Sequence, residues 1–188
     1  IDQTTGSGGF LIKGRTVELV GVESSGKTTL TLHSARYGQK MGWKGIFIDT
    51  EGSFDFSYCA AVGPKVDNKT FCVIQPLCAE EMDKVIDIFV REMGKELDYI
   101  IFDSIATTRP KSVINRDSED AIRPGAHAAW WSTYIHKLRS ISLKYGVALL
   151  FTNQVRAKIQ TAGAQFSVLN TGIGAGFNAR DTAVTTTG

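Results

Sequence analysis

Hydrophobic residues occur in five short runs, separated by longer segments of mixed polarity. Several of these runs are continuously apolar and do not alternate, which is typical of strands that are covered on both faces in a parallel sheet. We therefore predict a strand at each run. The five runs are Thr16–Val20, Gly45–Asp49, Phe71–Gln75, Tyr99–Asp103 and Val147–Thr152.

Two segments between these runs have the spacing of an amphipathic helix. In Ala79–Met93, hydrophobic residues recur at i, i+3, i+4, i+7, i+8 and i+11. A second segment, Ala126–Lys144, places Trp131, Ile135 and Leu138 on one stripe. Because strands alternate with helices, the pattern predicts a doubly wound α/β domain with a mostly parallel sheet flanked by helices.

Two long stretches, Ser104–Gly125 and Gln154–Gly188, show no clear period. Stretches of this length are uncommon in compact domains unless they are functional or disordered. No internal repeat or linker divides the chain, so we interpret residues 1–188 as one domain. The second stretch runs to the end of the chain, whereas a fold of this kind normally returns to the sheet after such a loop. We therefore expect residues 1–188 to be a fragment.

The composition fits one globular domain and excludes several classes of protein. The 188 residues are 43% hydrophobic, and the apolar runs are too short to cross a bilayer. Cys59, Cys72 and Cys78 lack the spacing of a zinc site, so we expect buried, reduced thiols in a cytoplasmic protein. A net charge of +2 is weak evidence for nucleic-acid binding, so that function needs local evidence.

The segment Gly21-Val-Glu-Ser-Ser-Gly26-Lys27-Thr28 follows the first predicted strand and has the spacing G-x-x-x-x-G-K-[ST]. Its glycines allow the backbone to wrap around phosphate oxygens, and the helix that follows adds its positive end. We expect Lys27 to reach the β- and γ-phosphates of a nucleotide and the Thr28 hydroxyl to ligate Mg²⁺. The expected nucleotide contacts in this segment are Gly21, Glu23, Ser24, Ser25, Gly26, Lys27, Thr28 and Thr29.

Further polar residues stand at or just after the ends of predicted strands. Asp103 ends an apolar strand, where it can hold the Mg²⁺ ion. We expect Glu51 to be the general base that orients water toward the γ-phosphate, with Asp49 as a supporting or structural acid. Gln154 follows the fifth strand, where its amide can contact the γ-phosphate. Because open α/β sheets bind ligands at the carboxyl ends of their strands, Glu51, Lys27 and Gln154 are the predicted catalytic residues.

Four segments together resemble the bacterial RecA recombinases. They are GVESSGKTTLTL (21–32), FIDTEGSFDFSY (47–58), IIFDSIATTRPK (100–111) and LLFTNQVRAKI (149–159). The resemblance covers almost the whole chain, and the segments occur in the family's order. By this resemblance the chain is identified as the ATP-binding core of such a recombinase, with a P-loop NTPase fold of the RecA type.

The resemblance implies an ATP- and Mg²⁺-dependent enzyme whose ATP hydrolysis is stimulated by DNA. It also implies a helical filament on single-stranded DNA that exchanges strands with homologous duplex DNA, in the cytoplasm and close to the nucleoid. Asp55 and Tyr58 match the contacts to the nucleotide base, and Gln154 matches the residue that senses the γ-phosphate. The expected DNA contacts are Arg123, Ser132, Arg156, Lys158, Thr185, Thr187 and Gly188.

The chain also departs from the family pattern. Ala129 and His136 stand where the family usually has arginines, and the second loop is longer, so the resemblance points to a divergent member, cellular or phage-encoded. By the same resemblance, we expect the family's N-terminal docking helix and the part after the second loop to lie outside residues 1–188. Two alternatives stay open: a helicase-type motor of the same fold, and a non-catalytic accessory paralogue. The retained Lys27, Glu51 and Gln154 disfavour the paralogue, because a structural protein has no need of hydrolytic residues.

Overall fold

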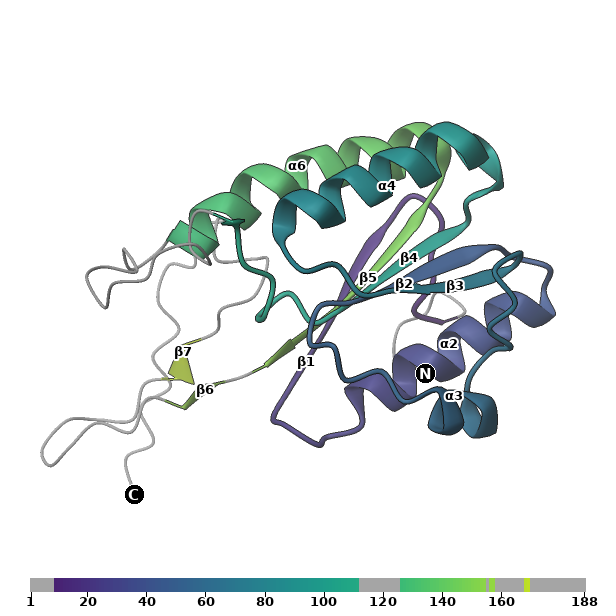
Figure 1. Cartoon of the computed structure of the whole chain (residues 1–188), viewed down its shortest axis with the longest axis horizontal. Coiled ribbons are helices and arrows are strands. Elements are labelled where there is room, and N and C mark those ends of the chain that lie inside the picture. Colours follow the sequence, from purple (N-terminus) through teal and green to yellow (C-terminus); the bar gives the residue numbers. More distant parts are fainter. Residues whose placement is uncertain (1–8, 112–125, 155, 158–167, 170–188) are drawn as a thin grey trace, which may run out of the picture.

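Five parallel strands form one sheet in the order β1-β5-β4-β2-β3 (Figure 1). The computed structural model describes residues 9–111, 126–154, 156–157 and 168–169 of the chain. Every neighbouring pair in this sheet is parallel, which confirms the predicted α/β class. The strands are β1 (Thr16–Gly21), β2 (Gly45–Asp49), β3 (Phe71–Ile74), β4 (Tyr99–Asp103) and β5 (Ala148–Gln154).

Helices cover both faces of the sheet. Helices α4 (Ala79–Met93) and α6 (Ala126–Tyr145) lie on one face, and α2 (Lys27–Lys40) and α3 (Phe56–Val62) lie on the other (Figure 1). The predicted helices agree with α4 and α6 to within one residue; a short 3-10 turn, η1 (Gly94–Glu96), follows α4. The hydrophobic pattern does not predict α3, because its seven residues make only about two turns. Within the described part of the chain, no helix is long and apolar enough to span a membrane.

Alternate residues of each inner strand point to opposite faces, so the sheet has two cores. On one side, Ile100, Phe102 and Phe151 belong to the cluster that includes residues of α4 and α6. On the other side, Phe47 and Ile101 pack in a cluster with residues of α2 and α3. All of β2 and β4 and nearly all of β5 are buried, which confirms that these continuously apolar runs are covered on both faces.

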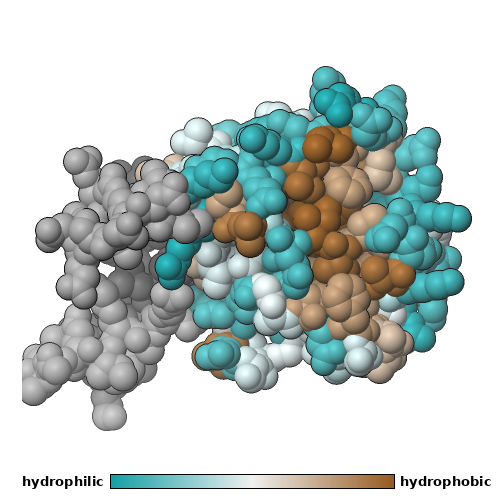
Figure 2. All heavy atoms as spheres, in the orientation of Figure 1, coloured by the Kyte–Doolittle hydropathy of each residue, from teal (hydrophilic) through white to brown (hydrophobic). Residues whose placement is uncertain are grey.

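The two edge strands, β1 and β3, are less covered than the inner strands. Strand β1 is half-buried or exposed along its whole length, and β3 has one buried residue, Phe71, followed by three half-buried ones. Figure 2 shows hydrophobic side chains gathered across α4 and the adjacent β3 edge. Ile88 of α4 is 48% exposed, and Ile74 of β3 and Phe89 of α4 are partly buried. The apolar surface of the sheet therefore reaches solvent at the β3 edge.

The three cysteines are free thiols. Cys59 and Cys78 are buried, as expected, whereas Cys72 is half-buried because β3 is an edge strand. Burial raises the pKa of the Cys59 and Cys72 thiols, so both are neutral at pH 7.

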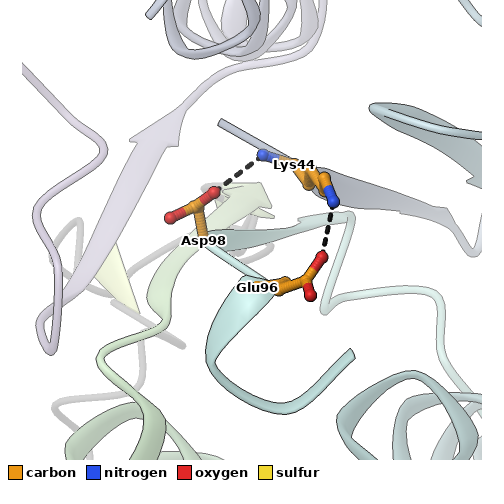
Figure 3. Close-up of polar contacts among 3 residues, drawn as sticks. All are labelled: Lys44, Glu96 and Asp98. Atoms are coloured by element: carbon orange, nitrogen blue, oxygen red, sulfur yellow. Dashed lines mark hydrogen bonds and ion pairs between the residues drawn. The ribbon is translucent and has the colours of Figure 1, made fainter. Parts of the chain in front are cut away.

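Polar contacts join the starts of β2 and β4, at the amino ends of these strands (Figure 3). The backbone N–H of Lys44 donates to Asp98 Oδ2 at 2.8 Å, and the Lys44 ammonium lies 2.6 Å from Glu96 Oε2. The Lys13 ammonium lies 2.6 Å from Asp98 Oδ1. The hydrogen bond to Glu96 raises the pKa of Lys44, but such an exposed pair adds little stability. These contacts therefore help to align β2 with β4 more than they stabilise the fold.

Gly45, the first residue of β2, packs against the ring of Tyr99. A Cβ atom added at Gly45 would lie 2.3 Å from the nearest ring carbon of Tyr99, and the ring is fully buried. We expect Gly45→Ala to lower the free energy of unfolding by about 1–3 kcal/mol, because the methyl group overpacks the core. Urea denaturation measures this loss.

A double-mutant cycle tests the same contact. Tyr99→Leu removes the ring that the new methyl group would meet, so this substitution should cost less stability in the Gly45→Ala background than in the wild type. Equal costs in the two backgrounds would contradict the packing described here.

Candidate nucleotide site

The turn between β1 and α2 has the backbone conformation expected of the predicted phosphate-binding loop. Gly26 has φ of 85° and Ser24 has φ of 58°, and the first of these left-handed positions favours glycine. Helix α2 begins at Lys27, and its N-cap residue, Gly26, has no side chain to cap the helix. The first N–H groups of α2 therefore face the loop without a side-chain acceptor from the N-cap, as an anion site requires. Glu23, Ser24 and Ser25 are exposed on this loop.

Lys27 lies inside the loop that it follows. Its ammonium group donates to the carbonyl oxygens of Gly21 at 3.2 Å and Val22 at 2.7 Å. The positive charge thus stands beside the positive end of α2, and both favour a bound phosphate group. The expected reach of Lys27 to the β- and γ-phosphates stays a prediction, which this placement supports.

Asp103 connects the phosphate-binding loop to the centre of the sheet. Its Oδ2 accepts a hydrogen bond from the Thr28 hydroxyl at 2.6 Å, and its Oδ1 accepts one from the Thr152 hydroxyl at 2.5 Å. Asp103 is only 9% exposed. The structure therefore brings together the two residues expected to hold the metal ion, Thr28 on α2 and Asp103 on β4.

The chemistry of this pair fits Mg²⁺. Carboxylate and hydroxyl oxygens are hard ligands, and Mg²⁺ in nucleotide sites usually takes one or two protein ligands together with phosphate oxygens and water. Among the described residues, no group of three or more His, Cys, Asp or Glu side chains could form a cage for a metal ion. A site completed by phosphate oxygens agrees with Thr28 and Asp103 as the protein ligands.

Glu51 lies where the carboxyl ends of three strands meet. Its Oε1 accepts a hydrogen bond from the Ser104 hydroxyl at 2.8 Å and one from the Gln154 side-chain amide at 3.3 Å. The Glu51 side chain is exposed, whereas Ser104 is 1% exposed. The predicted pair Glu51 and Gln154 is thus in contact. The sequence pattern does not identify Ser104, although its place directly after Asp103 is a signal that could have found it.

Asp49 holds the turn that presents Glu51. Its Oδ1 accepts the backbone N–H groups of Glu51 and Gly52, each at 3.0 Å, and its Oδ2 accepts the N–H of Phe54 at 2.9 Å. The Gln75 side-chain amide donates to the same Oδ2 at 2.8 Å. Because Asp49 is 3% exposed and its oxygens are occupied by these donors, its role is structural.

Asp55 and Tyr58 lie beside the start of α2. Asp55 caps α3, because its Oδ1 accepts the backbone N–H of Tyr58 at 2.9 Å. The Tyr58 hydroxyl lies 2.7 Å from the Thr29 hydroxyl, in hydrogen-bond contact. The cap and this bond place α3 next to the start of α2. Their contact with a nucleotide base stays a prediction.

The predicted DNA contacts are only partly within the described residues. Ser132 is exposed on α6. Arg156 belongs to β6 (Arg156–Ala157), which pairs antiparallel with β7 (Val168–Leu169). The predicted contacts that lie outside the described residues are Arg123, Lys158, Thr185, Thr187 and Gly188.

Known proteins of one family match this chain along most of its length. A model of the RecA N-terminal domain matches residues 1–177. The chain belongs to the RecA family. It is 38% identical to Protein RecA of Mesoplasma florum over 159 residues, which are 85% of this chain and 46% of that protein. It is also 38% identical to Protein RecA of Campylobacter hominis over 163 residues, which are 87% of this chain and 45% of that protein.

This RecA-family chain spans about half the length of the curated relatives that it matches. Among solved structures, a crystal structure of the RadB recombinase matches with a TM-score of 0.60 and 24% sequence identity. The match covers 86% of this chain and 70% of the RadB chain. At this identity the likeness shows a shared fold.

The hydrogen bonds that Asp49 accepts predict that its substitution destabilises this RecA-family chain. Asp49→Asn replaces one acceptor oxygen by an N–H donor that faces other donors, so we expect it to lower the free energy of unfolding by about 1–3 kcal/mol. Gln75→Leu removes one donor and leaves the three backbone bonds, so its loss should be smaller. Urea denaturation of the two variants compares these losses, and equal stability of Asp49→Asn and wild type would contradict the structural role.

Proposed function

We propose that this chain is the ATP-hydrolysing core of a recombinase that assembles on single-stranded DNA and pairs it with homologous duplex DNA. The observation that carries the proposal is the contact between Glu51, just after β2, and Gln154, at the end of β5. Both residues lie at the edge of the sheet where Asp103 ends β4 and accepts a hydrogen bond from Thr28 of α2. Membership in the RecA family supports the recombinase over a helicase-type motor of the same fold.

In the proposed reaction, each residue has a distinct task. Lys27 and the first N–H groups of α2 hold the phosphates. Thr28 and Asp103 hold Mg²⁺, which when bound neutralises charge on the phosphate oxygens. Glu51 orients the attacking water and accepts its proton at the carboxylate. The hydrogen bonds from Ser104 and Gln154 both reach Oε1, which leaves Oε2 as the oxygen for the water.

Gln154 can couple the nucleotide state to DNA binding. It is the last residue of β5 and stands directly before the stretch that, by resemblance, contains the second DNA-binding loop. A γ-phosphate that attracts the Gln154 amide would weaken its 3.3 Å contact with Glu51. The position of Gln154 would then differ between nucleotide states, and the chain that follows would differ with it.

The β3 edge supports the proposed self-association into a helical filament. An exposed strand edge offers backbone groups to another chain, and hydrophobic side chains gather across α4 and this edge on the face that Figure 2 shows. We place this activity in the cytoplasm, close to the nucleoid. For a phage-encoded protein, this is the cytoplasm of the host cell. The three free thiols agree with a reducing compartment.

ATP turnover with and without single-stranded DNA tests the proposal. We expect DNA to stimulate hydrolysis in the wild type, and Glu51→Gln to reduce the stimulated rate by about 100-fold or more, because the variant lacks the general base. Glu92→Gln is the matched control: Glu92 is exposed on α4 and pairs with Arg91, so its rate should equal that of the wild type.

Other outcomes would replace the proposal. Nucleotide binding without turnover would favour the accessory paralogue. A turnover rate that DNA does not change would contradict the proposed role of DNA. Turnover that persists in Glu51→Gln would contradict the role of Glu51 as the general base.

A further inference from the structure

The segment of residues 104–111 is attached to the turn that carries Glu51. The Thr50 hydroxyl donates to the carbonyl oxygen of Ser104 at 2.5 Å and lies 2.8 Å from the Thr107 hydroxyl. The Thr107 hydroxyl also lies 3.1 Å from the Ser104 carbonyl, and its single proton can be donated either to that carbonyl or to Thr50. Thr50 directly precedes Glu51 in the chain, so two hydroxyl groups and one carbonyl connect this turn to the segment.

Ser104 is the rigid element of this arrangement. It is 1% exposed, and the N–H of the next residue, Ile105, donates to the carbonyl of Thr152 on β5 at 3.1 Å. The Ser104 hydroxyl donates to Glu51 Oε1 at 2.8 Å. The exposed Glu51 side chain is thus contacted by a buried hydroxyl group whose backbone is held from two sides.

The far end of the segment is attached to α4. The carbonyl of Arg109 accepts the N–H of Ala79, the first residue of α4, at 2.9 Å. The N–H of Lys111 donates to the Glu80 carboxylate, at 2.9 Å to Oε2 and 3.1 Å to Oε1. The segment therefore bridges two places, the turn of Glu51 and the start of α4, so that its position depends on both.

We propose that Ser104, Thr50 and Thr107 are positioning residues that set where the Glu51 carboxylate lies, so that hydrolysis depends on the placement of the 104–111 segment. This inference rests on the proposed role of Glu51 as the general base. Hydrogen bonds to Oε1 fix the rotation of the carboxylate and thereby aim Oε2. Because a misplacement of about 1 Å can reduce a rate by about 100-fold, loss of these hydroxyl groups should lower turnover without weakening nucleotide binding.

Substitutions within the segment separate positioning from packing. Thr107→Val keeps the shape of the side chain but removes the hydroxyl, and Thr107→Ser keeps the hydroxyl. Thr108→Val is the matched control, because the Thr108 hydroxyl is 3.5 Å from the same Ser104 carbonyl and makes at most a weak bond. Ser104→Ala removes the direct donor to Glu51.

The readouts are kcat for ATP with single-stranded DNA, the affinity for a fluorescent ATP analogue, and urea denaturation. We expect kcat to fall about 10-fold in Thr107→Val and at least as much in Ser104→Ala. Affinity should stay within about twofold of wild type, since these residues touch neither the phosphate-binding loop nor Lys27. Thr107→Ser and Thr108→Val should retain the wild-type kcat.

The outcomes distinguish this inference from the proposed function. Two results, with Glu51→Gln still inactive, would overturn the positioning role alone. One is a wild-type kcat in both Ser104→Ala and Thr107→Val. The other is a loss of kcat in Thr108→Val as large as the loss in Thr107→Val. Turnover that persists in Glu51→Gln would overturn the proposed function and this inference together. If Thr107→Val unfolds, Ser104→Ala decides alone: a reduced kcat supports the positioning role, and a wild-type kcat overturns it.

Discussion

The carboxylate of Asp103 takes one hydroxyl hydrogen bond from Thr28 on α2 and another from Thr152 on β5. This almost buried group therefore joins the helix of the phosphate-binding loop, the central strand β4 and its neighbour β5. A buried carboxylate without such donors would cost several kcal/mol, so the place of the loop relative to the sheet depends on these two bonds. The residue that follows Asp103 is Ser104, whose hydroxyl donates to the Glu51 carboxylate.

The hydrophobic pattern predicts those helices and strands whose apolar residues are buried against the sheet or its helices. The runs that became β2, β4 and β5 are apolar throughout because each lies between two layers of helices, and α4 shows its period because one face packs on the sheet. Helix α3 was missed since seven residues are too few for a periodic signal. The partial exposure of Cys72 is not predictable in this way, because the edge position of β3 follows from the strand order and not from the local sequence.

The candidate site was predicted where residues near in sequence share one task. The spacing of Gly26, Lys27 and Thr28 identifies the phosphate-binding loop directly. The contacts among Glu51, Ser104 and Gln154 join residues more than 50 positions apart, and they exist because β4 lies between β2 and β5. That order cannot be obtained from local patterns. The sequence could therefore name Glu51 and Gln154 as candidates but could not identify the hydroxyl groups that hold the carboxylate.

A strand-exchange assay tests most directly whether the proposed nucleotide site drives homologous pairing. Labelled single-stranded DNA is incubated with the protein, ATP and Mg²⁺, together with either a homologous or an unrelated duplex. We expect joint molecules with the homologous duplex alone, and none when ATP is left out. Displacement of strands irrespective of homology, or no joint molecules in the presence of ATP turnover, would contradict this role.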